Sequence, residues 1–480
     1  LMSSLFASLG ASTGALAAFE RVLDVTQNNV SNASTPGYAA QLATLQAQSF
    51  DPNHGLPGGV ASVEITSTRD QYADQSVRGQ VTSLGYAQQQ TTSLTGIQSN
   101  FDISGQSGIP GALSGLLQSF SALSISPNDP ASRNSILANA QKVVDAFHQT
   151  DAALSQASAA TDQQLRSTAG QINNLAGKLQ EYNVERKRNS SPDAGLDAKV
   201  QSTLENLSQL ADISTTVAAD GTTTVLLGGQ TPLVVGSNSY SVQVGLTPPG
   251  GPPPLYPGGT PAMQLQDQNG QDITSQVTHG TLGSLLHTRN VTLAGLRGDG
   301  TQPGTLNRLA KGFADRVNAI LTSGQIAGNP DPRAGVALFT YDATDDTAAG
   351  RSLAVNPAIT AQTIAAIDPG PPSSSNGIAV RLAALAQPSA AADKIDNVSF
   401  TEFYGAIAGG VGQKLSDARD QNDLQTNLVA QARSLRSQIS GVSLDREAVR
   451  LVEFQKAYQA TAHMVTILNE LTQATVDMIK

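Results

Sequence analysis

The sequence contains no cysteine and no tryptophan, and aromatic residues make up only 4% of its 480 positions. The absence of cysteine excludes disulfides, thiolate metal sites and cysteine nucleophiles, and it suits a protein that leaves the cell without passing an oxidising folding compartment. With so few aromatic side chains, alanine, leucine and valine must supply most of the buried surface. Small apolar side chains favour close packing of helices over a large globular centre.

Charge is also scarce, since Asp, Glu, Lys and Arg together form 14% of the chain and the net charge is −10. An ordinary soluble domain carries roughly 25% charged residues. An acidic chain without clustered Lys and Arg lacks the surface that binds nucleic-acid phosphates, so we expect no nucleic-acid partner. No apolar run approaches the roughly 18 residues of a membrane span, so we expect no membrane insertion.

Signals of chemistry and of classical secretion are missing as well. The five histidines are scattered without metal-ligand spacing, and the sequence has no nucleophile elbow, phosphate-binding glycine loop or His-Glu-x-x-His helix. The N-terminal segment has no basic stretch followed by an apolar one, so no cleavable signal is expected. We therefore expect no catalytic residue, no cofactor and no metal, and a protein that is not an enzyme.

What the sequence does contain is a seven-residue repeat at its start. Apolar residues recur at this spacing through the first 32 positions, and Leu5 and Phe19 extend the same stripe. The row consists of Met2, Leu9, Leu16, Leu23 and Val30. A sustained heptad repeat predicts a helix that packs in a supercoiled seam.

The last 37 residues repeat the pattern, with Phe454 and Leu468 widening the stripe. The row consists of Leu444, Leu451, Tyr458, Val465, Thr472 and Ile479. Such a stripe cannot be buried by a lone helix, so we expect the two terminal helices to pair as a coiled-coil-like unit. Two interpretations remain open: that both are ordinary core helices, or that both order only on assembly, because chain ends usually fray.

A helix stop follows the first helix, at residues 28–38. Pro36 disfavours helical geometry at Thr35, and Gly37 tolerates the positive φ that a type II turn requires after proline. Asn and Ser side chains can bond the backbone groups that the ending helix leaves open. The residue pattern alone predicts a turn at this place and nothing further.

This stretch also resembles the Asn-Asn-Ile-x-Asn-x-x-Thr-Pro-Gly-Tyr motif of flagellar rod, hook and hook-associated proteins. The matching positions are Asn29, Asn32, Thr35, Pro36, Gly37 and Tyr38. Segments 108–113, 128–133, 280–286, 338–339 and 440–445 are similar to those typical of the hook-associated protein 1 family. The resemblance therefore covers nearly the whole chain.

The resemblance implies a structural adaptor of the bacterial flagellum at the hook–filament junction, exported through the flagellar channel to the cell exterior. Implied partners are hook protein, the neighbouring junction protein of the hook-associated protein 3 type, copies of the chain in a ring, and an export chaperone on the C-terminal helix. The expected assembly interface comprises Leu9, Leu16, Phe19, Leu23, Val30, Leu451, Phe454, Tyr458, Val465, Leu468 and Ile479.

Other identities compete with this interpretation. Hook protein and flagellin are also axial proteins, although the block at 440–445 disfavours the first and the Pro-Gly-Tyr motif disfavours the second. A secreted enzyme or adhesin could carry flagellar ends for export. It would show a compact extra domain with clustered polar residues, and none is visible in the sequence.

Two departures from the family pattern affect the expected structure. Arg446 stands where relatives carry a Glu three residues after the capping Ser443, so it cannot return the capping-box hydrogen bond. Relatives also insert an outer β-rich domain after the Leu338-Phe339 marker, for which this chain leaves no room.

We expect a mainly α fold with a β-rich portion and an elongated multi-helix body. Apolar periodicity predicts helices over 131–187, 302–323 and 399–437, the last antiparallel to the first, and a β-hairpin flap within 213–278. The expected division is discontinuous: terminal helical domain 1–35 with 443–480, connecting segment 36–75, and body 76–442.

Overall fold

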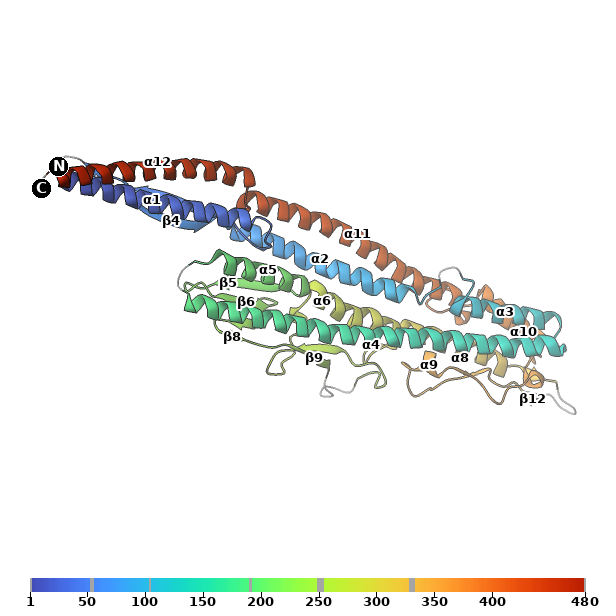
Figure 1. The fold of residues 1–480 in the computed structure, drawn as a ribbon. Coiled ribbons are helices and arrows are strands. Elements are labelled where there is room, and N and C mark those ends of the chain that lie inside the picture. The colour runs from blue at the N-terminus through green and yellow to red at the C-terminus, as the bar shows by residue number, and fades with distance from the viewer. Residues whose placement is uncertain are drawn as a thin grey trace.

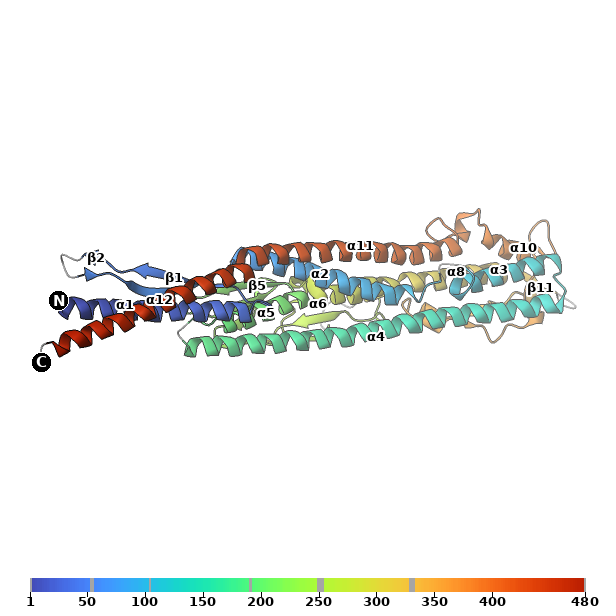
Figure 2. The same cartoon turned by 45° about the horizontal axis from the view of Figure 1, so that its top comes forward.

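The computed structural model describes residues 2–51, 56–102, 105–189, 192–247, 254–327 and 333–478. The molecule is long and mainly helical, and both chain ends lie at the same tip (Figures 1 and 2). This tip is formed by α1 (Met2–Ser31) and α12 (Leu444–Asp477), which lie alongside each other. The predicted fold class, mainly α with a β portion and with paired ends, is confirmed.

The rest of the chain is dominated by three long helices: α2 (Gln71–Gln98), α4 (Pro130–Arg188) and α11 (Phe400–Ser440). Helix α4 begins because Asp129 accepts hydrogen bonds from the backbone of Ala131 and Ser132, while Pro130 supplies the fixed φ of a first turn. The shorter helices are α3 (Gly108–Ile125), α5 (Ala194–Leu210), α6 (Gly280–His287), α7 (Ala294–Arg297), α8 (Thr305–Thr322), α9 (Ala349–Ser352) and α10 (Gly377–Ala383). Short turns are η2 (Thr274–Gln276), η3 (Thr288–Leu293), η4 (Ala361–Thr363), η5 (Ala384–Ala386) and η6 (Ala391–Asp393).

The direction of α11 differs from the prediction. Its late residues Val429 and Ala432 pack on Val77, early in α2, and Thr91, late in α2, donates to the Ala418 carbonyl. Helix α11 is therefore antiparallel to α2. It runs in the same direction as α4 (Figure 1), because the starts of both helices meet in one core and the ends of both approach α5. Chain direction depends on which helix the loops bring alongside, and periodicity does not encode it.

The β-rich portion is also more than a flap. A four-stranded antiparallel sheet has the order β5 (Ile213–Val217), β6 (Thr223–Leu227), β7 (Thr231–Val235) and β8 (Asn238–Ser239). A separate pair follows, β9 (Gln243–Leu246) with β10 (Met263–Gln266). Val225, Leu227, Leu233 and Val234 are fully buried in a core shared with α4 and α5. The sheet is integral to the body because its alternating apolar side chains need these helices to cover them.

The connecting segment contains a hairpin that sequence analysis missed. Strand β1 (Gln41–Ala47) pairs antiparallel with β4 (Val60–Ser67), and β2 (Phe50–Asp51) pairs with β3 (Leu56–Pro57) near the tip. The alternation of apolar Ala61, Val63 and Ile65 with polar residues after the Gly58-Gly59 pair was the available signal. Smaller pairs elsewhere are β11 (Gln325–Ile326) with β12 (Arg333–Ala334) and β13 (Phe339–Thr340) with β14 (Ala354–Val355).

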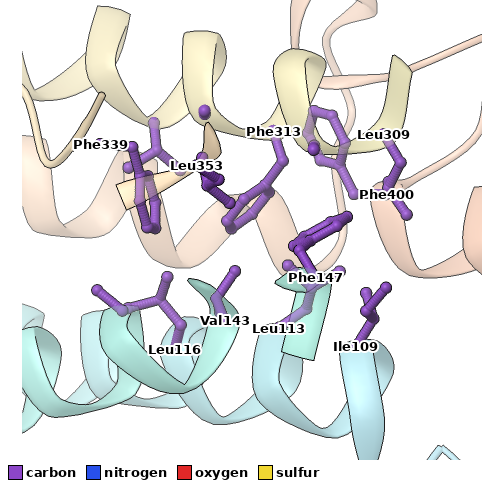
Figure 3. Close-up of a cluster of buried hydrophobic side chains, with 14 of the residues drawn as sticks. Ile109, Leu113, Leu116, Val143, Phe147, Leu309, Phe313, Phe339, Leu353 and Phe400 are labelled. Atoms are coloured by element: carbon purple, nitrogen blue, oxygen red, sulfur yellow. The ribbon is translucent and has the colours of Figure 1, made fainter. Parts of the chain in front are cut away.

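The largest apolar core lies at the end of the molecule far from the chain termini, between α3, α4, α8 and the start of α11 (Figure 3). The Phe313 ring lies 6.0 Å from that of Phe339 and 5.4 Å from that of Phe400, measured between ring centroids. Phe147 of α4 reaches the same cluster and is fully buried. We call α1, the β1–β4 hairpin and α12 the terminal arm, and the chain from α2 to α11 the body.

Candidate assembly surface

The terminal arm is held together along an inner seam, which we define as the half-buried apolar positions of α1 and α12. Phe19 and Phe454 contact each other across it, with ring centroids 6.0 Å apart. Of the predicted interface residues, eight are half-buried: Leu9, Leu16, Phe19, Leu23, Phe454, Tyr458, Val465 and Leu468. Val30 and Leu451 are more exposed, at 42% and 38%, and Ile479 lies outside the described residues.

Both terminal helices are formed and pack against each other in this structure. That they order only on assembly stays a prediction. On α1 the most buried positions lie on a row beside the predicted heptad: Ala18, Val22, Thr26 and Asn29. Helix α1 contacts the β1–β4 hairpin as well as α12, so this row faces the inside of a three-part arm. The predicted heptad row of α1 lies next to this buried row, and α12 and the hairpin cover it only in part.

Helix α12 is exposed over most of its surface. Among its described residues only Glu447 is buried, and α1 is the main element it packs against. Seven large apolar side chains of α12 are exposed: Leu444, Val449, Leu451, Val452, Met464, Ile467 and Leu471. Met464, Ile467 and Leu471 follow a spacing of three and four and so lie on one side of the helix, and an exposed apolar surface of this kind marks a contact site for another molecule. The predicted seven-residue row contains only Leu444 and Leu451 of this set, because the other exposed residues lie off that row.

The turn after α1 has the predicted geometry. The Tyr38 amide donates to the Thr35 carbonyl over 3.1 Å, and Gly37 adopts a φ of +77°. These are the hydrogen bond and the left-handed third residue of a type II turn with proline in second place. Thr35 and Pro36 are exposed, whereas Gly37 and Tyr38 are half-buried. The second half of the turn therefore packs against the rest of the protein, and the first half faces solvent.

Asn29 ties the end of α1 to the start of the hairpin. Its Nδ2 donates to the Gln41 carbonyl over 2.8 Å, and its Oδ1 accepts from the Gln41 amide over 2.9 Å. The Tyr38 hydroxyl also donates to Asn29 Oδ1, over 2.9 Å. Burial and the nearby Glu447 carboxylate raise the pKa of Tyr38, so its hydroxyl stays protonated and remains a donor. Asn32 donates to Asn28 Oδ1 and completes the group.

The same turn connects the arm to the body. A Cβ atom at Gly37 would lie 2.5 Å from the carbonyl oxygen of Ala198 in α5, so only glycine permits this approach. The Gly37 carbonyl accepts from Arg69 Nη2 over 2.7 Å, and Arg69 pairs with Asp74 of α2 at 2.9 Å. The family motif therefore lies where α1, α2 and α5 meet, a role that the residue pattern alone did not predict.

The break between α11 and α12 is fixed at the same junction. The Ser440 carbonyl accepts from the Ala40 amide over 2.9 Å and from the Thr68 hydroxyl over 3.2 Å. The Ser440 hydroxyl accepts from the Asp70 amide over 3.1 Å. Chain segments 372 positions apart thus share hydrogen bonds. We call this hydrogen-bonded group around Gly37 and Ser440 the junction.

Ion pairs continue the junction toward the body. Glu205 of α5 accepts from Arg433 Nε and Arg436 Nη1 of α11, both over 2.9 Å. Arg436 also lies 3.5 Å from Asp74 of α2. Burial alone would raise the pKa of Glu205, but the two arginines outweigh it and the pKa is lowered. Three helices are therefore linked where the arm begins.

No group of three or more metal-ligating side chains occurs among the described residues, and none of their helices has the length and apolar character to cross a bilayer. A cleft of about 850 Å³ lies between α2, α5 and β5. Its charged lining includes Arg69 paired with Asp74 and Arg186 paired with Asp197, so these groups neutralise each other.

Comparison with known proteins identifies the family. The model described as "Flagellar hook-associated protein FlgK helical domain" matches residues 94–339, just over half of the chain. The chain belongs to the FlgK family of flagellar hook-associated proteins. The model for the flagellar basal body rod protein matches residues 9–38, which include most of α1, and the model for the C-terminal region of the rod proteins FlgEFG matches residues 436–478, which include α12.

Individual relatives of the FlgK family agree with this assignment. Flagellar hook-associated protein 1 of Bacillus subtilis is 24% identical over 98% of this chain and 97% of its own length. The Salmonella typhimurium protein of the same name is 32% identical over 16% of this chain and 14% of its own length. The flagellar hook junction protein FlgK from Burkholderia pseudomallei superposes with a TM-score of 0.64, covering 76% of this chain and 100% of its own, at 16% identity.

Membership in the FlgK family confirms the resemblance seen in the sequence and, with it, a structural, hook-associated role in the flagellum. It also sets aside hook protein and flagellin as identities. The similarity to the Burkholderia structure concerns the fold, since its sequence identity is low.

Proposed function

We propose that this chain is a structural adaptor of the hook–filament junction that self-assembles through its terminal arm and carries out no catalysis. The observation that carries the proposal is α12, a helix of 34 residues with one buried side chain and seven large exposed apolar ones. A helix with so little burial is stabilised chiefly by contacts with other molecules once it is assembled.

The proposed location is the extracellular part of the flagellum, reached through the flagellar export channel. The absence of cysteine is compatible with this route. The proposed neighbours are hook protein, a junction protein of the hook-associated protein 3 type and further copies of this chain in a ring. An export chaperone would cover the C-terminal helix inside the cell, where the exposed apolar surface of α12 is otherwise prone to aggregate.

We further propose that residues 1–35 and 443–480 form the inner tube, with 36–75 as connector and 76–442 as the outer body. The residues proposed to contact neighbouring subunits are those predicted from sequence: Leu9, Leu16, Phe19, Leu23, Val30, Leu451, Phe454, Tyr458, Val465, Leu468 and Ile479. The partial exposure of the ten that the structure describes, all but Ile479, supports this use, since a fully buried residue could not reach a second molecule.

Deletion of the gene followed by complementation tests the proposal. Cells without the gene should keep hooks and lose attached filaments, and the unmodified gene should restore them. A Leu451→Ala/Tyr458→Ala variant should restore few filaments, because it removes apolar contacts on α12. The control is Val380→Ala, which truncates a side chain of α10 that is 50% exposed. Full filaments in the deleted strain would contradict the proposed function.

A further inference from the structure

The four-stranded sheet of the body ends in an open edge at β5. Among the described strands only β6 pairs with β5, because β5 stands first in the strand order. The Asp212 carbonyl and the Ala218 amide each bond to the residue opposite them, over 2.9 Å. Bonded pairs alternate along antiparallel strands, so the backbone groups of Ile213, Thr215 and Val217 point away from β6. Within the described part of the chain, these outward groups have no hydrogen-bond partner.

The sequence of β5 does not protect this edge from another strand. Proteins commonly block an open edge with Lys, Pro or a bulge, whereas β5 reads Ile-Ser-Thr-Thr-Val and pairs with β6 in regular register. All five of its residues line the cleft of about 850 Å³ between α2, α5 and β5. Gly79 lies on the α2 wall of this cleft, and a Cβ atom added there would meet nothing within 4 Å. The edge therefore faces a cavity of the size that holds a small ligand.

Arg78 of α2 lies in the cleft beside the middle of β5. Its Nη1 donates to Gln201 Oε1 over 3.1 Å, and its Nη2 donates to Thr215 Oγ1 over 3.2 Å. Both acceptors are uncharged. Arg69 and Arg186 of the same lining each pair with an aspartate, whereas Arg78 forms no ion pair with any described residue. Arg78 is therefore the guanidinium of the cleft that lacks a carboxylate partner.

Positive charge is in excess around Arg78. Four arginines surround two carboxylates where α2, α5 and α11 meet: Arg69, Arg78, Arg433 and Arg436 around Asp74 and Glu205. Both carboxylates already pair with the other three arginines. Burial lowers the pKa of Arg78 and, together with Arg436 and Arg69, outweighs the opposing effect of Asp74. A carboxylate brought against Arg78 would balance this excess and bond to its free N–H groups.

Other polar groups of the lining fit the same kind of ligand. Asp212 forms no ion pair with a described residue, but it lies three residues from Thr215, about 10 Å along the strand, where solvent screens its attraction to Arg78. Arg69 Nε and Ser208 Oγ are buried and have no hydrogen-bond partner among the described residues. Donors without acceptors at the wall of a cleft favour a ligand that carries acceptor oxygens.

We propose that this cleft is a docking site for an extended, acidic peptide segment of another protein, which adds to the open edge of β5 as a fifth strand. The backbone of the segment bonds the outward groups of Ile213, Thr215 and Val217. One of its carboxylate side chains pairs with Arg78. The inference goes beyond the proposed function and does not depend on it.

Two other occupants are outcomes of the same test. A small anion would pair with Arg78 and leave the backbone of β5 open. A neutral or basic segment would add to the edge and leave Arg78 without a carboxylate. The acidic segment is favoured because it satisfies both the open backbone groups and the excess of positive charge.

Peptide titration of the purified full-length chain tests the proposal. The probe is the labelled peptide Val-Thr-Glu-Val-Thr-Val, compared with the same peptide carrying Lys in place of Glu and with a fully N-methylated form. Fluorescence anisotropy should show saturable binding of the Glu peptide at or below about 1 mM. The Lys peptide should bind about tenfold more weakly because it lacks the ion pair. The N-methylated form should not bind, since it cannot donate hydrogen bonds to β5.

Two pairs of variants separate the charge from the strand edge. Arg78→Gln should weaken binding of the Glu peptide about tenfold, whereas Arg166→Gln, at an exposed position of α4, should leave it unchanged. Thr215→Pro removes an outward amide without removing a bond to β6, so it should abolish binding. Thr215→Ala keeps that amide and should retain binding. Circular dichroism checks that each variant is folded, and if Thr215→Pro is not, the N-methylated peptide supplies the test of the backbone.

Three results would overturn the proposal. The first is no binding of the Glu peptide at about 1 mM. The second is equal binding of the Glu and Lys peptides, which would exclude the ion pair with Arg78. The third is undiminished binding of the N-methylated peptide, which would make the cleft an anion site without strand addition. None of these results bears on the proposed function, which the gene deletion tests separately.

Discussion

The body and the terminal arm bury their apolar residues in different ways. The body encloses large side chains completely, among them Phe120, Phe147, Phe313 and Phe339. Among its described residues the arm has no comparable core: the one buried residue of α12 is Glu447, and its apolar residues are half-buried or exposed. The body thus has a closed apolar core of its own, whereas α12 leaves most of its apolar surface for other molecules to cover.

The two regions are joined by polar contacts. Arg69 donates to the Gly37 carbonyl, and Ser440 accepts from Ala40, Thr68 and Asp70, all within 3.2 Å. Hydrogen bonds to backbone groups depend on direction, so they fix the angle between arm and body more narrowly than apolar contacts would. An arm that must fit identical neighbours benefits from a fixed angle.

The largest expected effect is on the free energy of unfolding, when a phenylalanine in the core of the body is compared with one in the arm. Phe313→Ala should lower the free energy of unfolding by about 3–5 kcal/mol, because it leaves a cavity among fully buried rings. Phe454→Ala should cost about 1 kcal/mol or less in the same measurement, since the site is half-open and solvent can fill it. Chemical denaturation followed by circular dichroism measures both. Equal losses would mean that arm and body share one core.

The second prediction breaks the junction at its closest approach. Gly37→Ala places a side chain at a φ of +77° and directs its Cβ at the Ala198 carbonyl oxygen. Gly229→Ala is the matched control, because its φ is +74° and no atom lies within 4 Å of the new Cβ. The control should cost about 1 kcal/mol from backbone strain alone. Gly37→Ala should cost about 2–3 kcal/mol in thermal unfolding, since Ala198 must also move. Identical losses would show that the close approach to α5 is unimportant.

Local features of this fold were predictable from sequence because neighbouring residues determine them. The long helix was predicted over 131–187 and spans Pro130–Arg188, since its apolar spacing and the Asp129-Pro130 start are both local signals. The Pro36-Gly37 turn followed from backbone preferences of two residues. The pairing of the terminal helices followed from stripes that neither helix could bury alone.

Other features depend on contacts between distant segments and were therefore missed or wrong. The direction of α11 follows from its packing on α2, and the sheet in 213–278 requires β7 and β8 to pair with strands whose register no short pattern fixes. The approach of Gly37 to α5 links positions far apart in the chain. The exposed residues Met464, Ile467 and Leu471 of α12 lie off the predicted seven-residue row, so that row alone did not indicate them.

The third prediction concerns the ion pairs that link α5 to α11. The lowered pKa of Glu205 means that its charge stabilises the folded state above the unfolded-state pKa, about 4.3, and that this stability is lost as pH falls through the folded-state pKa. Glu205→Gln should therefore cost about 1–2 kcal/mol at neutral pH, and the deficit should shrink below about pH 4. Urea unfolding across this pH range measures it, with the exposed Glu181→Gln of α4 as control. A deficit independent of pH would exclude the charge as its cause.

The smallest expected effect concerns the two helix starts that frame α11 and α12. Helix α11 has a complete capping box, in which the Ser399 amide donates to Glu402 Oε2 over 2.8 Å and the Glu402 amide donates to Ser399 Oγ over 3.2 Å. Helix α12 has only the forward bond, from the Arg446 amide to Ser443 Oγ, at 3.5 Å. The capping box of α12 is incomplete because Arg446 stands where a Glu would return the hydrogen bond to the Ser443 amide.

Arg446→Glu should complete the box and also remove a positive charge from the positive end of the helix dipole. We expect it to stabilise α12 by about 0.5–1 kcal/mol, while Glu402→Gln in α11 should change stability by less, because glutamine can still return the bond. Hydrogen exchange of amides in the first turns of the two helices measures each change separately. Slower exchange confined to α12 is expected. Slower exchange in the body as well would show that stabilising α12 also stabilises the body through the junction. Arm and body would then unfold together, although they differ in how much apolar surface each buries.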